Sequence, residues 1–236
     1  MKLGILGAGL IAQAVATLAL KNGHEVMVSN SRGPQTLGDL AASLGCQAGT
    51  AEEAAVFGDM VLVAIPFHAC RTLSGASLAG KVVMDACNHY PGRDGADAAL
   101  DAMTDTSGQV LARQLPGARV VKVFNAIMAR DIVPHARASS ASSASSASSA
   151  SGATDRRALP IAGDDAAARR QVAAFLDEIG YDAVDAGPLA ESWRFERGMP
   201  GYCIPLRAAS MARALQAAQK GQRVPDGSWR GPRELA

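Results

Sequence analysis

The feature that most constrains this chain is a short glycine-rich turn close to its start. The run Leu3 to Leu6 is apolar and typical of a buried strand, and Leu10 to Lys21 carries apolar residues at helical spacing. Between them lies the pattern Gly7-x-Gly9-x-x-Ala12. Gly7 permits a tight turn, Gly9 lets the backbone approach a pyrophosphate, and Ala12 lets the helix pack closely on the strand. The sequence therefore predicts a strand, turn and helix that bind a dinucleotide.

A second predicted strand, Glu25 to Ser29, closes a βαβ unit of about 30 residues. Enzymes that use NAD usually place Asp or Glu after this strand, where the carboxylate accepts hydrogen bonds from the ribose 2′-OH. Here Asn30, Ser31 and Arg32 follow instead. A carboxylate would repel a 2′-phosphate, whereas a hydroxyl and a guanidinium can bind it. We therefore expect NADP(H) as the cofactor; the alternative is that Arg32 is a solvated loop charge.

Composition excludes several classes of partner. The chain has 236 residues and a formal net charge of +1, with acidic and basic residues interspersed. No basic stripe is present, and only 4% of residues are aromatic, so we expect no nucleic-acid partner. The first 20 residues resemble a signal peptide in bulk composition, but the glycine turn and Gln13 interrupt them. We therefore expect a cytoplasmic protein without a membrane partner.

The cysteines and histidines are scattered. Neither set has the spacing of a metal site, and no Cys-x-x-Cys pair occurs, so we expect reduced thiols and no bound metal. The residues concerned are Cys46, Cys70, Cys87, Cys203, His24, His68, His89 and His135.

Predicted strands and helices alternate along the rest of the chain, which indicates an α/β fold. The further predicted strands are Met60–Ile65, Val82–Ala86, Arg119–Phe124, Arg157–Ala162 and Asp182–Ala186. The further predicted helices are Leu37–Leu44, one capped by Thr50 and Glu53, Asp164–Ile179, and one within Ile204–Lys220. We expect a Rossmann-type, doubly wound, mostly parallel sheet with a small C-terminal αβ and helical extension.

An Ala-Ser-Ser tract from Ala138 to Ser151 interrupts this pattern. Because the tract has no apolar face, it predicts a flexible linker or loop. We accordingly expect a dinucleotide-binding domain at 1–137, a linker at 138–152, an αβ portion completing the domain at 153–206, and a helix with a mobile basic tail at 207–236. The helix could pack on a second subunit, as in a homodimer, or cover its own sheet.

Parallel sheets bind ligands beyond the carboxyl ends of their strands. At those ends the chain places Ile65-Pro66, Asn88 and Asn125. Both asparagines are candidate ligand-binding residues, although asparagine also caps turns.

The ordered set of motifs resembles the coenzyme F420-dependent NADP oxidoreductase family, in its broad bacterial form. The motifs are Gly7–Ala12, Ser29–Pro34, Ala64–Pro66, Asp85–Asn88, Val121–Ala126, Ala162–Asp165 and Asp185–Leu189. The similarity runs from Met1 to about Pro205, broken by the Ser/Ala tract. It implies direct hydride transfer between NADP(H) and a flavin-like or deazaflavin ring, a small-molecule redox acceptor.

The resemblance also implies roles for individual residues. Gly7, Gly9, Leu10 and Ile11 would hold the pyrophosphate, with Ser31 and Arg32 on the 2′-phosphate. Asn30 is a further candidate for cofactor binding. Ile65 and Pro66 would line the nicotinamide ribose, and Asn88 and Asn125 would lie near the nicotinamide ring or its acceptor. The family needs no covalent nucleophile.

Other polar residues near these strand ends have simpler interpretations. His68 and His89 could donate a proton, but loop histidines are common; Lys122 is expected to be structural and Cys87 a small packed residue. Two other functions stay open: a hydroxyacid or imine reductase, and a non-catalytic NADP(H)-binding sensor or partner protein.

Overall fold

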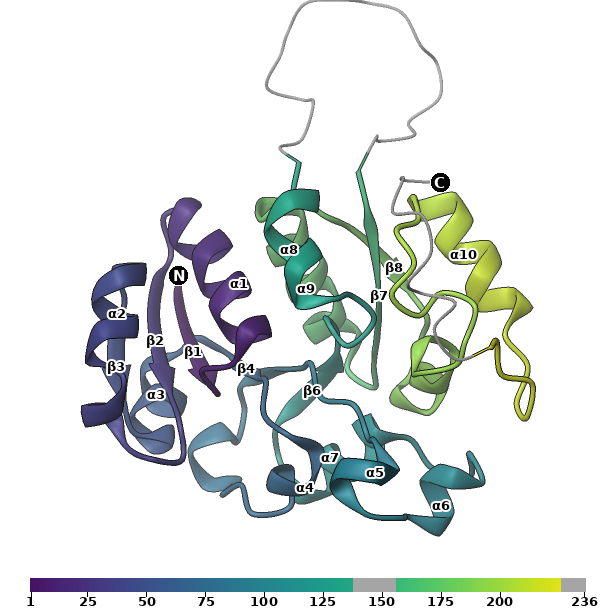
Figure 1. Cartoon of the computed structure of the whole chain (residues 1–236), viewed down its shortest axis with the longest axis horizontal. Helices are drawn as coiled ribbons and strands as arrows, with labels where there is room; N and C mark the ends of the chain where they lie inside the picture. Colours follow the sequence, from purple (N-terminus) through teal and green to yellow (C-terminus); the bar gives the residue numbers. More distant parts are fainter. Residues whose placement is uncertain (138–155, 226–236) are drawn as a thin grey trace, which may run out of the picture.

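The computed structural model describes residues 1–137 and 156–225. Eight strands form one sheet with the order β3-β2-β1-β4-β5-β6-β7-β8 (Figure 1). The strands are β1 (Lys2–Leu6), β2 (Glu25–Ser29), β3 (Gln47–Gly49), β4 (Met60–Val63), β5 (Val82–Asp85), β6 (Arg119–Lys122), β7 (Ala158–Gly163) and β8 (Asp182–Asp185). The first six strands run parallel, so their carboxyl ends meet along one edge.

The last two strands join this sheet in the opposite direction. β7 pairs antiparallel with β6, through Val121 with Gly163 and Lys122 with Ala162, and β8 runs parallel to β7. The predicted mostly parallel, doubly wound sheet is therefore confirmed, with the C-terminal αβ unit added at its end. Because β7 is reversed, its own carboxyl end lies away from the edge where β4, β5 and β6 end.

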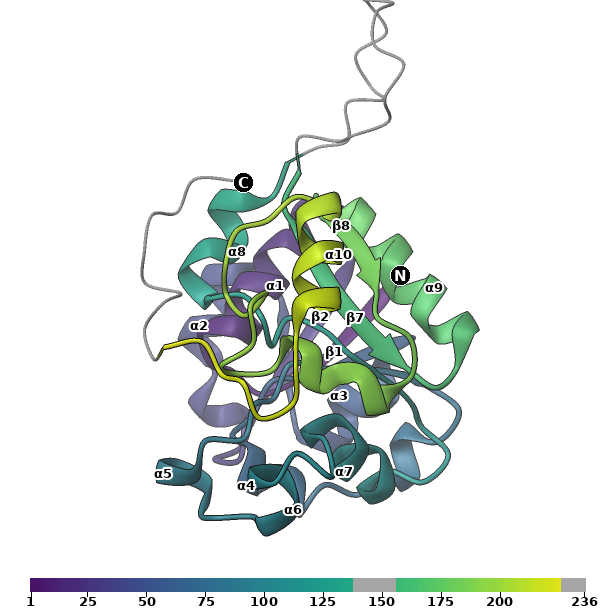
Figure 2. The ribbon, with the colours of Figure 1, turned by 90° about the vertical axis from the view of Figure 1, so that its right-hand side faces the viewer.

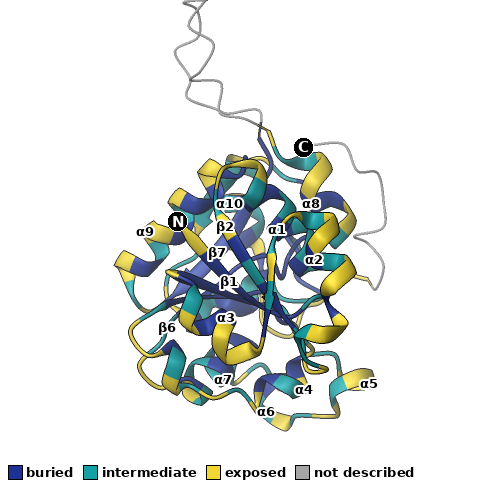
Figure 3. Ribbon diagram, turned by 90° about the vertical axis from the view of Figure 1, so that its left-hand side faces the viewer, coloured by how far each residue is buried: buried dark blue, intermediate teal, exposed yellow. Residues whose placement is uncertain are grey.

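Helices cover both faces of the sheet. The α-helices are α1 (Leu10–Lys21), α2 (Gly38–Leu44), α3 (Ala51–Phe57), α4 (Phe67–Cys70), α5 (Pro91–Asp94), α6 (Ala98–Asp101), α7 (Ser107–Gln114), α8 (Ala129–His135), α9 (Ala166–Glu178) and α10 (Ala208–Ala217). Short 3-10 turns are η1 (Pro34–Thr36), η2 (Ala76–Leu78) and η4 (Leu189–Phe195). Residues of α1, α8 and α9 share one apolar cluster, and residues of α3, α4 and α7 share another. Figure 3 shows the buried strands between these layers.

The first βαβ unit follows its prediction closely. α1 spans the expected residues, and β1 pairs with β2 over its whole length. Gly7 has a φ of 123°, and a Cβ built there would lie 2.3 Å from the carbonyl oxygen of Ala64. Only glycine suits this turn, both for its backbone angle and for the close approach of the neighbouring strand.

Several predicted strands end earlier in the structure. β4, β5 and β6 stop at Val63, Asp85 and Lys122, so Ile65, Pro66 and Phe124 lie in loops. The Ala64 N–H still donates to the sheet, but Pro66 has no N–H and begins a turn. Apolar character extends past each strand because these loops are themselves buried or line a pocket. A strand ends where its backbone hydrogen bonds to the neighbouring strand end, and side-chain burial can continue beyond that point.

Local capping signals predicted helix starts well, with one correction. The capping box of α3 is present, with Thr50 and Glu53 each bonding the other's backbone N–H. The predicted helix began at Asp164, but α9 begins at Ala166 with Asp165 as its N-cap, and the Asp164 carboxylate instead accepts the Leu189 N–H. The edge strand β3 was not predicted, because three residues are too few for a period to emerge.

The C-terminal helix covers its own sheet. α10 packs on β7 and β8, with Met211 and Leu215 buried in a cluster that includes Ala158 and Ala162 (Figure 2). It is shorter than the segment Ile204–Lys220 that was expected to contain it. The predicted linker at 138–152 and nearly all of the predicted tail lie outside the described residues.

No helix within residues 1–137 and 156–225 is long and apolar enough to cross a bilayer.

Candidate functional site

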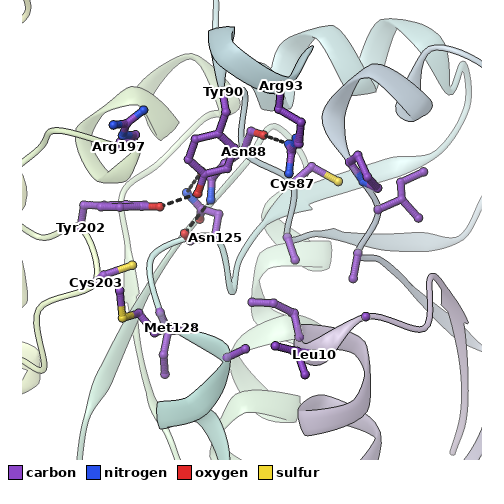
Figure 4. Close-up of a pocket in the computed structure, with 18 of the residues that line it drawn as sticks. Leu10, Cys87, Asn88, Tyr90, Arg93, Asn125, Met128, Arg197, Tyr202 and Cys203 are labelled. Atoms are coloured by element: carbon purple, nitrogen blue, oxygen red, sulfur yellow. Dashed lines mark hydrogen bonds between the residues drawn. The ribbon is translucent and has the colours of Figure 1, made fainter. Parts of the chain in front are cut away.

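Two pockets meet at the glycine turn, on the edge of the sheet where the parallel strands end. The first, of about 540 Å³, extends from the turn past the end of β2. The second, of about 770 Å³, extends from the turn past the ends of β4, β5 and β6. Both are lined by Gly9, Ala64, Ile65 and Pro66. We call them the β2-side pocket and the β5-side pocket; Figure 4 shows the latter.

The start of α1 has the features of a phosphate site. Gly9 is the N-cap residue, and no side chain in the described parts of the chain caps the helix there. A Cβ built on Gly9 would meet nothing within 4 Å, so the backbone faces open pocket space. Free N–H groups at a helix start, together with the helix dipole, favour an anion. Leu10 and Ile11, expected to hold the pyrophosphate, line the β5-side pocket beside this turn.

The end of β2 shapes the wall of the β2-side pocket. Asn30 accepts the Arg32 N–H (2.9 Å) and donates to Thr36 Oγ1 (2.9 Å), which holds the loop. Asn30 and Ser31 line the pocket, whereas the exposed Arg32 is not among the lining residues. The structure thus brings two of the three predicted residues to the wall and leaves the third in solvent next to them.

The two predicted asparagines come together in the β5-side pocket. Asn88 Nδ2 donates to the backbone oxygen of Asn125 (2.9 Å), and Asn125 Nδ2 donates to Asn88 Oδ1 (3.3 Å) and to Phe195 O (3.2 Å). Phe124, just before Asn125, has a φ of 62°, which turns the chain out of the strand direction. Asn125 is buried, and its Oδ1 has no partner among the described residues. A buried carbonyl oxygen without a donor is a natural acceptor for a ligand.

A buried ionic network lies behind the asparagines. Lys122 Nζ donates to Asp85 Oδ2 (2.9 Å), to Ser107 Oγ (2.8 Å) and to the backbone oxygen of Cys87. Ser107 in turn donates to Glu196 (2.7 Å). Burial by itself lowers the pKa of Lys122, but the charges of Asp85 and Glu196 outweigh it and hold that pKa above its usual value. Lys122 is therefore a charged residue that links the end of β5 to the segment after η4, through Asp85 on one side and through Ser107 and Glu196 on the other.

The wall opposite Leu10 contains a tyrosine pair between two arginines (Figure 4). The hydroxyls of Tyr90 and Tyr202 are 2.8 Å apart. The guanidinium carbons of Arg93 and Arg197 lie 4.8 Å and 5.6 Å from the centroid of the Tyr90 ring. Burial raises the pKa of the Tyr202 phenol, so Tyr202 stays protonated at neutral pH.

The α5 turn that supplies this wall is held by Asp94. Its carboxylate accepts hydrogen bonds from Arg93, from the Tyr90 N–H (2.9 Å) and from the His68 ring (2.8 Å). Burial by itself raises the pKa of Asp94, but these hydrogen bonds more than offset it and the net pKa lies well below the usual value. His68 is thus bound to Asp94 and does not line the β5-side pocket.

Two other residues considered from the sequence have structural surroundings. His89 Nε2 lies 2.8 Å from Gly95 O, and this histidine is not among the lining residues of the β5-side pocket. Cys87 is buried, with its sulfur 3.3 Å from that of Cys70. The hydrogen bond with Cys70, with burial, raises the pKa of the Cys87 thiol, so it stays protonated. Among the described residues, Cys46, Cys70, Cys87 and Cys203 form no disulfide.

Sequence reasoning missed most of the far wall. The missed lining residues with polar or charged groups are Tyr90, Arg93, Arg130, Arg197 and Tyr202. Tyr90 could have been predicted as a lining residue, because it lies only two residues after Asn88 in the sequence. Arg197 and Tyr202 follow η4, more than 70 residues after Asn125 in the sequence, and no local pattern marks them. The Cys203 N–H donates to Ala126 O (3.1 Å), which holds this segment over the strand ends.

Known proteins resemble this chain over different lengths. Metalloreductase STEAP3 of Rattus norvegicus is 28% identical over 210 residues, covering 86% of this chain and 38% of STEAP3. YjhV of Escherichia coli (strain K12) is 40% identical over 67 residues, covering 28% of this chain and 49% of YjhV. The chain thus spans half or less of the length of these two relatives.

A solved structure shares the fold over most of its length. A candidate F420-dependent NADP-reductase from Arthrobacter sp. FB24 has a TM-score of 0.65 and 23% identity, covering 81% of this chain and 87% of that one. The family model described as "NADP oxidoreductase coenzyme F420-dependent" matches residues 2–89. These residues contain the glycine turn, the segment after β2 and the strand ends as far as Asn88. Over residues 2–89, the chain is thus similar to the coenzyme F420-dependent NADP oxidoreductase family.

Proposed function

We propose that this protein is an NADPH-dependent oxidoreductase in which a hydride passes between NADP(H) and a flavin-like or deazaflavin acceptor. The observation that carries this proposal is the β5-side pocket of about 770 Å³, which starts at the glycine turn and continues past Asn88 and Asn125. Its volume is well inside the range of about 300–1,000 Å³ for small-molecule sites. With the adenosine half of the cofactor in the β2-side pocket, the β5-side pocket has room for a nicotinamide and a second ring.

The residues at the turn suit the cofactor. Gly9 and the free N–H groups of α1 would hold the pyrophosphate, and Leu10 and Ile11 lie beside them. Ser31 and the neighbouring Arg32 would bind the 2′-phosphate, since no carboxylate at the end of β2 repels it. Ile65 and Pro66, which line both pockets, would line the nicotinamide ribose.

Asn88 and Asn125 would position the nicotinamide end. The unpartnered Oδ1 of Asn125 can accept a hydrogen bond from an amide group, while its Nδ2 stays bonded to the protein. NADPH supplies the hydride when bound; the protein orients the reactants and keeps water from the transfer site. No covalent nucleophile is needed, and the protonated thiol of Cys87 offers none.

Isotope transfer tests the proposal directly. NADPH deuterated at the transferred position is mixed with a 5-deazaflavin analogue of riboflavin, whose accepting atom is a carbon that retains deuterium. We expect NADPH oxidation at 340 nm and a product one mass unit heavier than with unlabelled NADPH. Oxidation without deuterium in the product would contradict direct hydride transfer.

A variant pair connects this activity to the asparagines. Asn125→Ala should slow hydride transfer about tenfold to a hundredfold, because misplacement of the nicotinamide by 1 Å is costly, with little change in the NADPH dissociation constant. Asn22→Ala is the matched control, because Asn22 lies on the surface at the end of α1 and lines neither pocket. A melting temperature measured for each separates misfolding from misplacement.

One observation favours an imine or hydroxyacid reductase as a second candidate. The Tyr90–Tyr202 hydroxyl pair lies in the β5-side pocket and could donate the proton that reduction of a C=N or C=O group requires. Turnover of a cyclic imine or a 2-keto acid, abolished in Tyr90→Phe, would support this function over flavin reduction. Tight NADPH binding without oxidation by any acceptor would instead indicate a sensor.

A further inference from the structure

A buried carboxylate joins two of the loops that shape the β5-side pocket. Asp94 is the last residue of α5, and its side chain is 1% exposed. Its Oδ1 accepts hydrogen bonds from the His68 N–H (3.3 Å) and the His68 ring (2.8 Å), and its Oδ2 accepts one from the Tyr90 N–H (2.9 Å). Because His68 lies in α4, which follows β4, and Tyr90 lies after β5, the Asp94 side chain holds these two segments together.

The same carboxylate orients Arg93, which in turn reaches Asn88 (Figure 4). Arg93 Nε donates to Asp94 Oδ1 (2.9 Å) and Arg93 Nη2 donates to Asp94 Oδ2 (2.8 Å), which makes a bidentate pair. The Arg93 Nη2 group also donates to Asn88 O (2.8 Å), and Asn88 Nδ2 donates to Asn125 O (2.9 Å). A chain of hydrogen bonds therefore runs from Asp94 through Arg93 to the two asparagines.

The exposure of these side chains indicates which of them organises the others. The side chains of Arg93 and His68 are 43% and 54% exposed, whereas that of Asp94 is almost completely buried. A long exposed side chain keeps several rotamers, and pairing with a fixed partner removes that freedom. The Asp94 carboxylate is such a partner, because it is itself held by hydrogen bonds from three residues.

We propose that Asp94 is a positioning residue for the nicotinamide half of the cofactor. Through Arg93 it fixes the place of Asn88, and through His68 it fixes the start of α4, directly after Pro66. The inference rests on the proposed function and adds a residue that acts on the same site from outside it. Asp94 is not among the lining residues of the β5-side pocket, so it acts through its partners and does not touch the cofactor.

The fluorescence of bound NADPH tests this role without any acceptor. A nicotinamide that is held still in a pocket has a longer fluorescence lifetime than one that moves freely. We expect Asp94→Asn to shorten the lifetime of bound NADPH toward that of NADPH in water. The dissociation constant should change little, because the adenosine half and the pyrophosphate stay bound. Hydride transfer to the 5-deazaflavin analogue should slow about tenfold, since the reactants are then misaligned.

Asp97→Asn is the matched control. Asp97 is a neighbouring carboxylate that pairs with Arg71 (2.7 Å) and caps α6, and it does not line the β5-side pocket. Its substitution should leave both the NADPH lifetime and the transfer rate unchanged. Melting temperatures of the two variants separate a general loss of stability from misplacement of the nicotinamide.

Arg93→Gln interrupts the same chain at its next residue. Because the Arg93 side chain is partly exposed, this variant should fold even if Asp94→Asn does not. It should shorten the NADPH lifetime as well, and the double variant Arg93→Gln, Asp94→Asn should lose no more than Asp94→Asn alone. Fully additive losses would overturn the inference, because the two residues would then act separately.

The outcomes separate this inference from the proposed function. An unchanged NADPH lifetime in Asp94→Asn would overturn the inference even if the native protein transfers hydride, and so would an unchanged lifetime in Arg93→Gln. A shortened lifetime in Asp94→Asn, with no hydride transfer by the native protein, would support the positioning role and contradict the proposed function.

Discussion

The two pockets that meet at the glycine turn are built in different ways. The β2-side pocket takes the turn, the end of β2 and the loop after β4 from the first 80 residues of the chain. The β5-side pocket combines residues from the ends of three strands with Arg197 and Tyr202, which follow η4. The first is assembled from the N-terminal third of the chain, and the second from segments that lie far apart in the sequence.

This difference has an energetic counterpart. The turn of the β2-side pocket depends on backbone geometry, as at Gly7, where the φ of 123° and the close approach of Ala64 both require glycine. The β5-side pocket depends on buried polar contacts, such as those of Lys122 and Asn125, which exist only in the folded state. Buried polar groups are costly when one partner is removed. A substitution in one pocket should therefore leave the other intact, and substitutions of buried polar residues beside the β5-side pocket should cost the most stability.

The largest effect is expected from Lys122→Met. This change leaves the buried carboxylate of Asp85 without its cation, so the free energy of unfolding should fall by about 3–5 kcal/mol in urea or guanidinium titrations. Lys21→Met, on the exposed end of α1, should change it by less than about 0.5 kcal/mol. The double variant Lys122→Met, Asp85→Asn should recover part of the lost free energy of unfolding. A loss below about 1 kcal/mol in Lys122→Met alone would show that the network does not stabilise the fold.

A smaller and purely local effect is expected from Arg32→Glu. The new carboxylate repels the 2′-phosphate, so the dissociation constant for NADPH should rise about tenfold to a hundredfold. Affinity for NADH should change little. Fluorescence titrations with both cofactors test this, with Lys21→Glu as a control of equal charge change. Equal losses for NADH and NADPH would contradict a role in recognising the 2′-phosphate, and so would no loss for either.

The smallest effect concerns a contact between the first βαβ unit and the C-terminal unit. His24 lies 3.1 Å from Glu178 of α9; burial lowers the pKa of His24, and Glu178 only partly opposes this. The folded state therefore binds fewer protons than the unfolded state, and the His24 contribution to stability, present above pH 6.5, is lost as the pH falls.

Unfolding free energies at pH 7.5 and pH 5.5 test this sign. The native protein should lose more stability between these values than His24→Gln does. An equal loss in both proteins would mean that other groups carry the pH dependence.

Much of the fold could be predicted because its signals are local. The limits of α1, the αL glycine after α2 and the capping box of α3 each depend on residues within a few positions of one another. Strand ends were predicted less well: Ile65 and Phe124 are apolar loop residues, and period and hydropathy do not separate a paired residue from a buried unpaired one. The reversal of β7 left no sequence signal, since an antiparallel and a parallel neighbour are buried alike.

By itself the sequence determined the glycine turn, the expectation of NADP(H) and the edge of the sheet where a ligand would lie. These follow from backbone angles, the charge after β2 and the rule that parallel strands end together. Only the tertiary structure decided what faces the turn, namely the paired asparagines and the Tyr90 wall with Arg93 and Arg197, and what supports them, the buried Lys122 network. Their partners lie tens of residues away in the sequence, where spacing carries no information about contact.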